Sequence, residues 1–145
     1  MAAQVVVPDA SVILKWLLPS AEEPDADKAL ALLDATEAEA VHCLLPGLWF
    51  YEVGNILVRR FPANAAAWLT TLQGLQLDEA PRTPRWLAAA LSLTRRHGVT
   101  FHDAAYHATA LVHDGMFVTA DRRYVERAGA AGGVVTLSDW TPALR

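Results

Sequence analysis

The sequence predicts an α/β fold in which helices cover both faces of a parallel sheet, because short apolar runs alternate with helical segments along the whole chain. The first apolar run, at residues 4–7, is continuous rather than alternating, which is typical of a strand buried on both faces. Later segments repeat apolar residues at helical spacing, as in Trp49, Val53 and Ile56. The length of 145 residues suits a single domain, so we expect residues 1–145 to form one.

The first third of the chain predicts two strands and two helices. Pro8 ends the strand at 4–7, and apolar residues then follow at helical spacing until Pro19 stops the first helix. Residues 22–39 are rich in alanine, leucine and acidic residues, which favours a second helix. The apolar run at 41–45, closed by a Pro-Gly pair, predicts the second strand.

The rest of the chain continues the alternation. The helix that contains Trp49 ends near Phe61, and Pro84 in a first turn with Gly98 after the last turn marks a helix at 84–97. The other predicted elements are helices at 63–75, 100–113 and 121–128 and strands at 77–80, 116–119 and 134–137.

The charge balance limits how this protein can meet a nucleic acid. A formal net charge of −4 repels a polyanion, so any such contact must be local. Two of the three arginine pairs fall in the last turns of predicted helices, where cations offset the helix dipole. The pair Arg122 and Arg123 instead follows Asp121 near a predicted helix start, where guanidinium groups suit contact with phosphate.

Cysteine content and hydropathy indicate the compartment. The only cysteine is Cys43, which excludes a disulfide framework and a cysteine zinc site and favours a reducing compartment. No stretch approaches the roughly 18 uncharged apolar residues that a membrane span needs. The first four residues carry no basic side chain, which argues against a signal peptide. We therefore expect a cytoplasmic protein that makes no membrane contact.

Four acidic residues are expected at one edge of the sheet. In an open parallel sheet, ligands bind beyond the carboxyl ends of the strands. Asp9 follows the first strand and Asp121 follows the fourth, while Glu52 and Asp103 lie in the first turns of helices whose side chains can face the same edge. Four carboxylates gathered there repel one another strongly unless cations lie among them.

Each acid also has a purely structural explanation. Asp9 and Asp121 can cap the helices that they precede, Thr100 with Asp103 fits a capping box, and Glu52 can lie on a solvated helix face. Taken singly, capping is the stronger interpretation for Asp103 and Asp121. We favour a common site because all four acids fall at the same predicted edge.

Carboxylate oxygens are hard ligands, so the predicted metal is Mg²⁺ or Mn²⁺ rather than zinc. Divalent ions held by such acids bind a phosphodiester and activate water for in-line displacement, which makes phosphodiester hydrolysis the predicted chemistry. Asn55, three residues after Glu52, can hydrogen-bond a carboxylate on the same helix face. His107, four residues after Asp103, can tune that carboxylate or contact the substrate, whereas the five histidines together form no zinc motif.

The four segments that carry these acids resemble a known family. They read VVPDASV at residues 6–12, WFYEVGN at 49–55, FHDAAY at 101–106 and VTAD at 118–121. In this order and at these intervals they resemble the PIN domain, specifically the VapC toxins of bacterial toxin-antitoxin pairs. The resemblance extends over almost the whole chain.

The resemblance implies a three-layer α/β/α fold with a parallel sheet of strand order 3-2-1-4-5. The first and fourth strands are then neighbours, and the residues that follow them meet at the topological switch point. It also implies a metal-dependent ribonuclease toxin in which the hydroxyls of Ser11 and Thr119 assist metal or phosphate binding. The carboxylates implied to be both catalytic and metal-binding are Asp9, Glu52, Asp103 and Asp121.

The same resemblance implies an RNA substrate, a homodimer, and a cognate antitoxin whose C-terminal segment lies in a groove of the toxin. DNA is then a partner only indirectly, through the antitoxin. Two positions depart from the family pattern: His102 stands where relatives commonly have an aromatic residue, and Arg122 with Arg123 stands where some carry a further acid. Arginines beside the site can contact the RNA backbone.

Two other function classes stay open. A receiver-like phosphoacceptor also uses an aspartate at a strand end, but Lys15 and Lys28 both lie early in the chain and leave no late lysine to hold phosphoryl oxygens. A non-catalytic interaction module that has kept the fold is the other alternative. The presence of all four acids favours the enzyme.

Overall fold

The computed structural model describes residues 2–142 and contains a five-stranded sheet whose strands all run parallel. The strands are β1 (Gln4–Pro8), β2 (Val41–Leu45), β3 (Asp78–Glu79), β4 (Met116–Thr119) and β5 (Val134–Thr136). Their order is β3-β2-β1-β4-β5, which confirms the predicted α/β fold class and strand order. In the centre, Val6 of β1 lies opposite Cys43 of β2 and Met116 of β4.

The connections between these strands are helical, as the sequence predicts. The α-helices are α1 (Ala10–Ile13), α2 (Ala26–Glu37), α3 (Leu48–Arg60), α4 (Ala65–Gly74), α5 (Pro84–His97), α6 (Phe101–Val112) and α7 (Arg122–Ala128). Three 3₁₀ turns are η1 (Leu14–Trp16), η2 (Gly129–Ala131) and η3 (Leu137–Asp139). No helix within residues 2–142 has the length and apolar character to cross a membrane.

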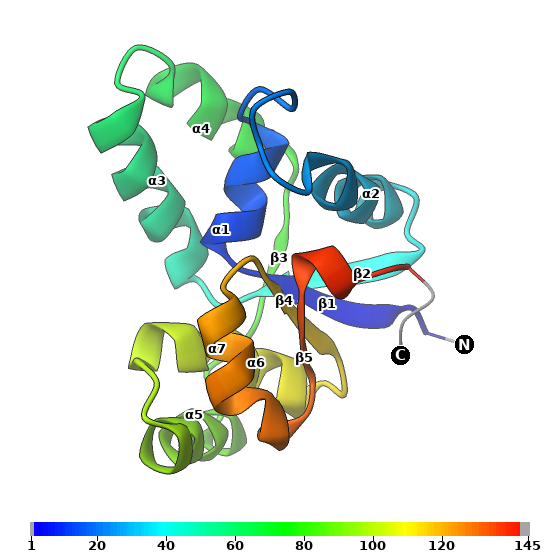
Figure 1. The fold of residues 1–145 in the computed structure, drawn as a ribbon, viewed down its shortest axis with the longest axis vertical. Helices are drawn as coiled ribbons and strands as arrows, with labels where there is room; N and C mark the ends of the chain where they lie inside the picture. The colour runs from blue at the N-terminus through cyan, green and yellow to red at the C-terminus, as the bar shows by residue number, and fades with distance from the viewer. Residues whose placement is uncertain (1, 143–145) are drawn as a thin grey trace.

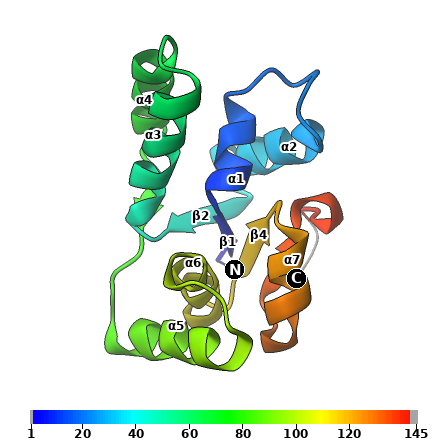
Figure 2. The ribbon, with the colours of Figure 1, turned by 60° about the vertical axis from the view of Figure 1, so that its left-hand side comes forward.

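Two layers of helices enclose the sheet. In Figure 1, α1 and α2 lie on one side of the strands and α5, α6 and α7 on the other. Figure 2 shows that α3 and α4 form a hairpin that extends beyond the sheet, while α6 lies between α5 and the strands. The core is built from strand residues such as Val6, Val7 and Phe117, none more than 1% exposed, with buried residues of the surrounding helices.

Most elements differ from their predicted bounds by one or two residues, and three elements differ for a clear structural reason. The first helix is shorter than predicted, because its last part tightens into the 3₁₀ turn η1, where Trp16 Nε1 donates to the carbonyl of Ala29. The second helix begins at residue 26 rather than 22, because residues 20–25 form turns and Asp25 has a left-handed backbone with φ 58°. β3 is only two residues long because it pairs with β2 on one side alone, at the edge of the sheet.

Candidate functional site

Asp9 lies at the carboxyl end of the central strand and is held from both sides. Its Oδ1 accepts hydrogen bonds from the Ser11 hydroxyl and, at 3.4 Å, from the backbone N–H of Val12. Its Oδ2 accepts from the Thr119 hydroxyl of β4 at 2.7 Å. The Asp9 residue is only 9% exposed. A buried carboxylate is tolerated here because two hydroxyls and a backbone amide replace its water.

The same two hydroxyls join the turn after β1 to the turn after β4. Ser11 Oγ accepts from the backbone N–H of Ala120 at 3.1 Å, and Thr119 Oγ1 accepts from the backbone N–H of Asp121, also at 3.1 Å. β1 and β4 are adjacent in the sheet. The strands that follow β1 in the chain, β2 and β3, lie on one side of this pair, and the strand that follows β4, β5, lies on the other side. Asp9 and Asp121 therefore flank the topological switch point of the sheet, where open α/β folds bind ligands.

Asp121 caps α7 with one of its two oxygens. Oδ1 accepts from the backbone N–H groups of Arg123 at 3.0 Å and Tyr124 at 3.2 Å. Within the described chain, Oδ2 makes no hydrogen bond, and Asp121 is exposed. The proposed cap is confirmed, yet it engages only half of the carboxylate and leaves the other oxygen for a ligand.

Glu52 and Asp103 come from helices on either side of the site. The Tyr106 hydroxyl of α6 donates to Glu52 Oε1 of α3 at 2.5 Å, and His102 Nδ1 lies 4.0 Å from Glu52 Oε2. Thr100 caps α6 by accepting from the backbone N–H of Asp103 at 3.2 Å, as the capping-box interpretation requires. The Thr100 side chain also hydrogen-bonds the Asp103 carboxylate, and this bond acts to lower the pKa of that group.

Two of these acids, Asp9 and Asp103, have raised pKa values. Burial raises the pKa of Asp9 from 3.8 to about 6, against the lowering effect of its hydroxyl and amide donors, and the charge of Asp103 raises it further. Burial also raises the pKa of Asp103, and the charge of Asp121 adds to that effect. The pKa of Tyr106 is raised by burial and by its bond to Glu52, so its hydroxyl stays protonated and keeps donating. The site is thus a region of unfavourable negative charge.

The carboxylates are not preassembled as a ligand cluster. Within residues 2–142, no group of three or more His, Cys, Asp or Glu side chains is arranged to hold a metal ion as the side chains stand. The role of the four acids as ligands of one or two divalent ions therefore stays a prediction. The donor set still fits a hard cation, because it consists of carboxylate and hydroxyl oxygens whose mutual repulsion a cation relieves. Asp121 is at the surface, where side chains change rotamer rapidly.

The other predicted site residues fall into two groups. Ser11 and Thr119 bond directly to Asp9, whereas Asn55 is exposed on α3 and makes no hydrogen bond to a carboxylate in the described residues. Arg122 and Arg123 are exposed in the first turn of α7, next to Asp121. Their positions leave them free to approach a phosphate backbone.

His107 corrects the sequence analysis. Its side chain is fully buried, with Nδ1 2.7 Å from the Tyr124 hydroxyl and Nε2 2.7 Å from the carbonyl of Gly132. Contact with RNA is incompatible with this position. The helical spacing from Asp103 was correct, but the next turn of α6 enters the core between the sheet and α7, where both ring nitrogens find partners.

Tyr106 and Tyr124 are site residues that the sequence analysis missed. The Tyr106 hydroxyl donates to Glu52. The Tyr124 hydroxyl bonds His107, and the backbone N–H of Tyr124 donates to the capping oxygen of Asp121. Both are buried, and neither was assigned a role from the sequence. A buried tyrosine hydroxyl needs a hydrogen-bond partner. This requirement is the sequence signal from which a bond to a site residue could have been inferred.

Several solved structures have the same fold. A toxin-antitoxin complex from Klebsiella pneumoniae matches with a TM-score of 0.64 and 16% identity, over 91% of this chain and 97% of that one. PAE2754 from Pyrobaculum aerophilum matches with a TM-score of 0.65 and 22% identity, over 95% and 92%. VapBC2 from Rickettsia felis, bound to a DNA fragment from its promoter, matches with a TM-score of 0.66 and 10% identity, over 91% and 96%.

At these identities the structural matches establish the fold. A search of curated protein sequences finds no match to this chain. The family model for the PIN domain, however, matches residues 6–130, which include all four acids and the strands that position them. This chain belongs to the PIN domain family.

Proposed function

We propose that this protein is the toxin of a toxin-antitoxin pair and acts as an endoribonuclease that depends on Mg²⁺ or Mn²⁺. One observation carries the proposal: Asp9, buried and held by two hydroxyls at the switch point, interacts with the charge of Asp103, which in turn interacts with that of Asp121. Burial of these carboxylates, with a smaller contribution from their mutual repulsion, destabilises the fold, so their presence calls for a function.

Under this proposal Asp9, Glu52, Asp103 and Asp121 hold the divalent ions. The bound ions neutralise the phosphodiester and supply the Lewis-acid chemistry of hydrolysis. Ser11 and Thr119 keep the Asp9 carboxylate in one orientation, and the Tyr106 hydroxyl does the same for Glu52. Arg122 and Arg123 contact the RNA backbone beside the acids, because guanidinium groups suit phosphate oxygens.

The proposed partners follow from the relatives that share the fold. The match to toxin-antitoxin complexes supports a cognate antitoxin as the partner of this chain. The match to a complex bound to promoter DNA supports DNA as a further partner of the pair, and we propose that this chain meets DNA only through the antitoxin. We further propose a homodimer that works in the cytoplasm. Size measurement of the protein alone and with the neighbouring gene product co-expressed tests both assemblies.

The receiver-like alternative loses support, because both lysines are engaged away from the acids. Lys15 Nζ donates to the carbonyl of Pro24 at 2.8 Å and pairs with Glu23 at 3.4 Å, and Lys28 Nζ donates to the carbonyl of Trp140 at 3.0 Å. Neither is placed to hold a phosphoryl group on Asp9.

The decisive experiment compares RNA cleavage by the wild-type protein and by Asp9→Asn. We expect the wild type to cut RNA with Mg²⁺ or Mn²⁺ and to stop when a chelator is added. Asp9→Asn removes the central carboxylate charge and keeps the side-chain shape, so cleavage should fall by about 100-fold or more. RNA cleavage by Asp103→Asn should fall by a similar factor.

The matched control is Asp34→Asn, which removes an exposed acid of α2. It should cut RNA like the wild type, and circular dichroism should show that all variants are folded. Undiminished cleavage by Asp9→Asn would contradict the proposed mechanism. A folded wild type that cuts no RNA with either ion would point to the non-catalytic module.

A further inference from the structure

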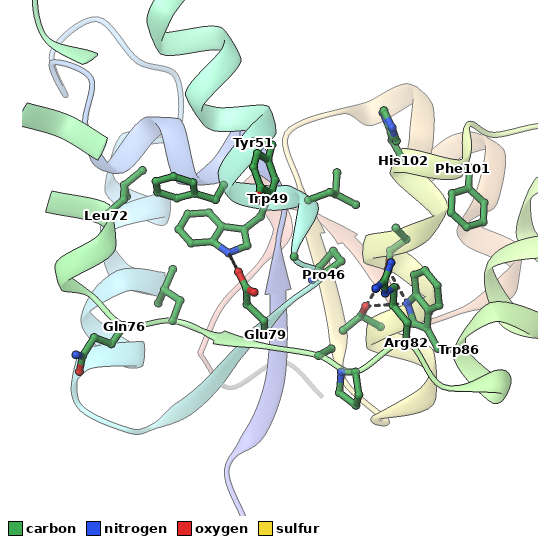
Figure 3. Close-up of a pocket in the computed structure, with 18 of the residues that line it drawn as sticks. Pro46, Trp49, Tyr51, Leu72, Gln76, Glu79, Arg82, Trp86, Phe101 and His102 are labelled. Atoms are coloured by element: carbon green, nitrogen blue, oxygen red, sulfur yellow. Dashed lines mark hydrogen bonds between the residues drawn. The ribbon is translucent and has the colours of Figure 1, made fainter. Parts of the chain in front are cut away.

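A large pocket lies next to the acids but contains none of them. Its volume is about 1110 Å³, and its walls come from the first turns of α3 and α6, the end of α4 and the segment between β3 and α5. Figure 3 shows Trp49 and Tyr51 on one side of it and Phe101, His102 and Trp86 on the other. The pocket and the acid site thus share two helices.

The sequence joins the two features directly. Tyr51 precedes Glu52, and Phe101 with His102 precedes Asp103. Tyr51, Phe101 and His102 line the pocket, whereas Glu52 and Asp103 do not. His102 bridges them, because its Nδ1 lies 4.0 Å from Glu52 Oε2. When a polymer such as RNA is bound at the acids, its neighbouring unit therefore lies next to the pocket.

Aromatic rings form the accessible walls of this pocket. Tyr51 is 78% exposed and Phe101 is 43% exposed. The Phe101 ring is held edge-on against Trp86, with ring centroids 6.0 Å apart and planes at 86°. Trp49 is fixed by donating from Nε1 to Glu79 Oε2 at 2.9 Å. Exposed aromatic side chains braced by buried ones are suited to stacking on a flat partner.

The charge in the pocket differs from that of the whole protein. Its only residues with a permanent charge are Glu79 and Arg82, and the Glu79 carboxylate already accepts a hydrogen bond from Trp49. Arg82 is exposed and makes no ion pair with a carboxylate in the described chain. The amides of Gln73 and Gln76 add neutral donors and acceptors. An acidic protein therefore presents here a surface that does not repel phosphate.

We propose that this pocket binds an unpaired base of the RNA whose backbone lies among the acids. The inference rests on the proposed nuclease function and narrows its substrate to single-stranded or looped RNA. Bases in a duplex are stacked on one another and do not reach into such a pocket, whereas unpaired bases stack on aromatic side chains and bond through their edges.

A second copy of this chain is the competing occupant. The polar lining disfavours it, since acidic residues are depleted from the buried centre of protein interfaces, and Glu79 lies in the pocket wall with the amides of Gln73 and Gln76. Two further exposed apolar residues, Val58 (59%) and Leu87 (45%), lie outside the pocket lining.

Binding is best measured in the full-length Asp9→Asn protein, which cannot cut under the proposed function. The probe is a short fluorescent RNA of randomised sequence, presented single-stranded or annealed to its complement, and the readout is anisotropy. Tyr51→Ala and Phe101→Ala should each bind the single strand about tenfold more weakly, since each removes a stacking surface. Affinity for the duplex should not change.

Three comparisons make the outcome specific. Tyr51→Phe and Phe101→Tyr should retain wild-type affinity, because both keep the ring. Val58→Ala, on the same helix as Tyr51 but outside the pocket, should also bind normally. Light scattering on every variant records its oligomeric state.

Equal losses for the single strand and the duplex, or no loss in either alanine variant, would overturn the pocket assignment. So would a loss of binding that occurs only where a dimer becomes a monomer, which would assign the pocket to a second copy. Cleavage by the wild type is scored separately. A wild type that does not cut, with ring-dependent binding intact, contradicts the nuclease and not the base pocket.

Discussion

Asp9 illustrates how one residue serves the fold and the site in opposite ways. Its capping bond to Val12 and its bonds to Ser11 and Thr119 stabilise the local structure, while its buried charge destabilises the whole. The folded pKa of about 6 against 3.8 corresponds to about 3 kcal/mol in favour of the protonated form. The ion-free fold should therefore be more stable when Asp9 is neutral.

This balance predicts a pH dependence of stability. Between pH 4 and pH 6 the unfolded chain has released the Asp9 proton and the folded chain still holds it, so the free energy of unfolding falls as pH rises. Asp9→Asn carries no such proton. In chelator, urea unfolding should show the stability of Asp9→Asn relative to wild type increasing from pH 4 to pH 6 and levelling by pH 7. A constant difference across that range would mean that Asp9 is not buried as a charge.

His107 and Tyr124 form a second coupled pair. A carbonyl only accepts, so Nε2 of His107 must donate to Gly132, and Nδ1 must then accept from the Tyr124 hydroxyl. Burial lowers the pKa of His107, which keeps the ring neutral and in this tautomer. Because the backbone N–H of Tyr124 also bonds Asp121, the pair fixes the start of α7.

Tyr124→Phe tests that pair by removing one hydroxyl. The buried Nδ1 then loses its only donor, which should lower the free energy of unfolding by about 1–3 kcal/mol. Tyr51→Phe is the matched control, since the Tyr51 side chain is largely exposed and should lose almost nothing. Chemical denaturation of both variants gives the comparison. Equal stability of Tyr124→Phe and wild type would show that water replaces the hydroxyl.

At the scale of elements, capping residues explain why most helices begin where the sequence predicts. Thr83 accepts from the backbone N–H of Trp86, and Thr100 and Asp121 do the same for α6 and α7. Gly98, with φ 63°, ends α5 in the left-handed conformation typical of a helix C-terminus. The start of α2 was mispredicted because Asp25 makes no side-chain cap and has φ 58°.

Position 115 requires glycine because a neighbouring strand leaves no room for a side chain. A Cβ at this position would lie 2.5 Å from the backbone oxygen of Val5 and 2.8 Å from its Cβ, because the entry to β4 packs directly against β1. Gly115→Ala should therefore push the two strands apart and lower the free energy of unfolding by about 1–3 kcal/mol.

The control for that prediction is Gly74→Ala at the end of α4. A Cβ there meets nothing within 4 Å, and alanine favours the helix by up to about 1 kcal/mol. Thermal or urea unfolding of the two variants should move in opposite directions. An unchanged Gly115→Ala would mean that β1 and β4 can separate freely.

For the whole molecule, the problem is how a chain of net charge −4 would approach the RNA that we propose as its substrate. Arg122 and Arg123 are exposed next to Asp121, whereas Arg59 and Arg60 lie at the opposite end of α3 from Trp49 and the pocket. Replacing Arg122 and Arg123 by alanine should weaken RNA binding and reduce its salt dependence by about 1–2 in the log–log slope. The same change at Arg59 and Arg60 should leave the slope unaltered. Anisotropy at several salt concentrations measures both.

The sequence by itself determined the fold class, the strand order through the family resemblance, and the alternation of helix and strand. These features depend on local spacing and on segments such as VVPDASV and VTAD, which the chain carries whatever its surroundings. The placement of Asp9 and Asp121, which follow β1 and β4, at one edge was also predictable, since parallel strands end at the same edge.

Only the tertiary structure decided which side chains meet. His107 lies in the core rather than at the substrate. Glu52 accepts a hydrogen bond from the Tyr106 hydroxyl, and an aromatic pocket lies between α3 and α6. Helical spacing states which residues share a face but not what packs on it. The physical reason is that burial and hydrogen-bond partners are properties of several elements at once, and no single segment contains them.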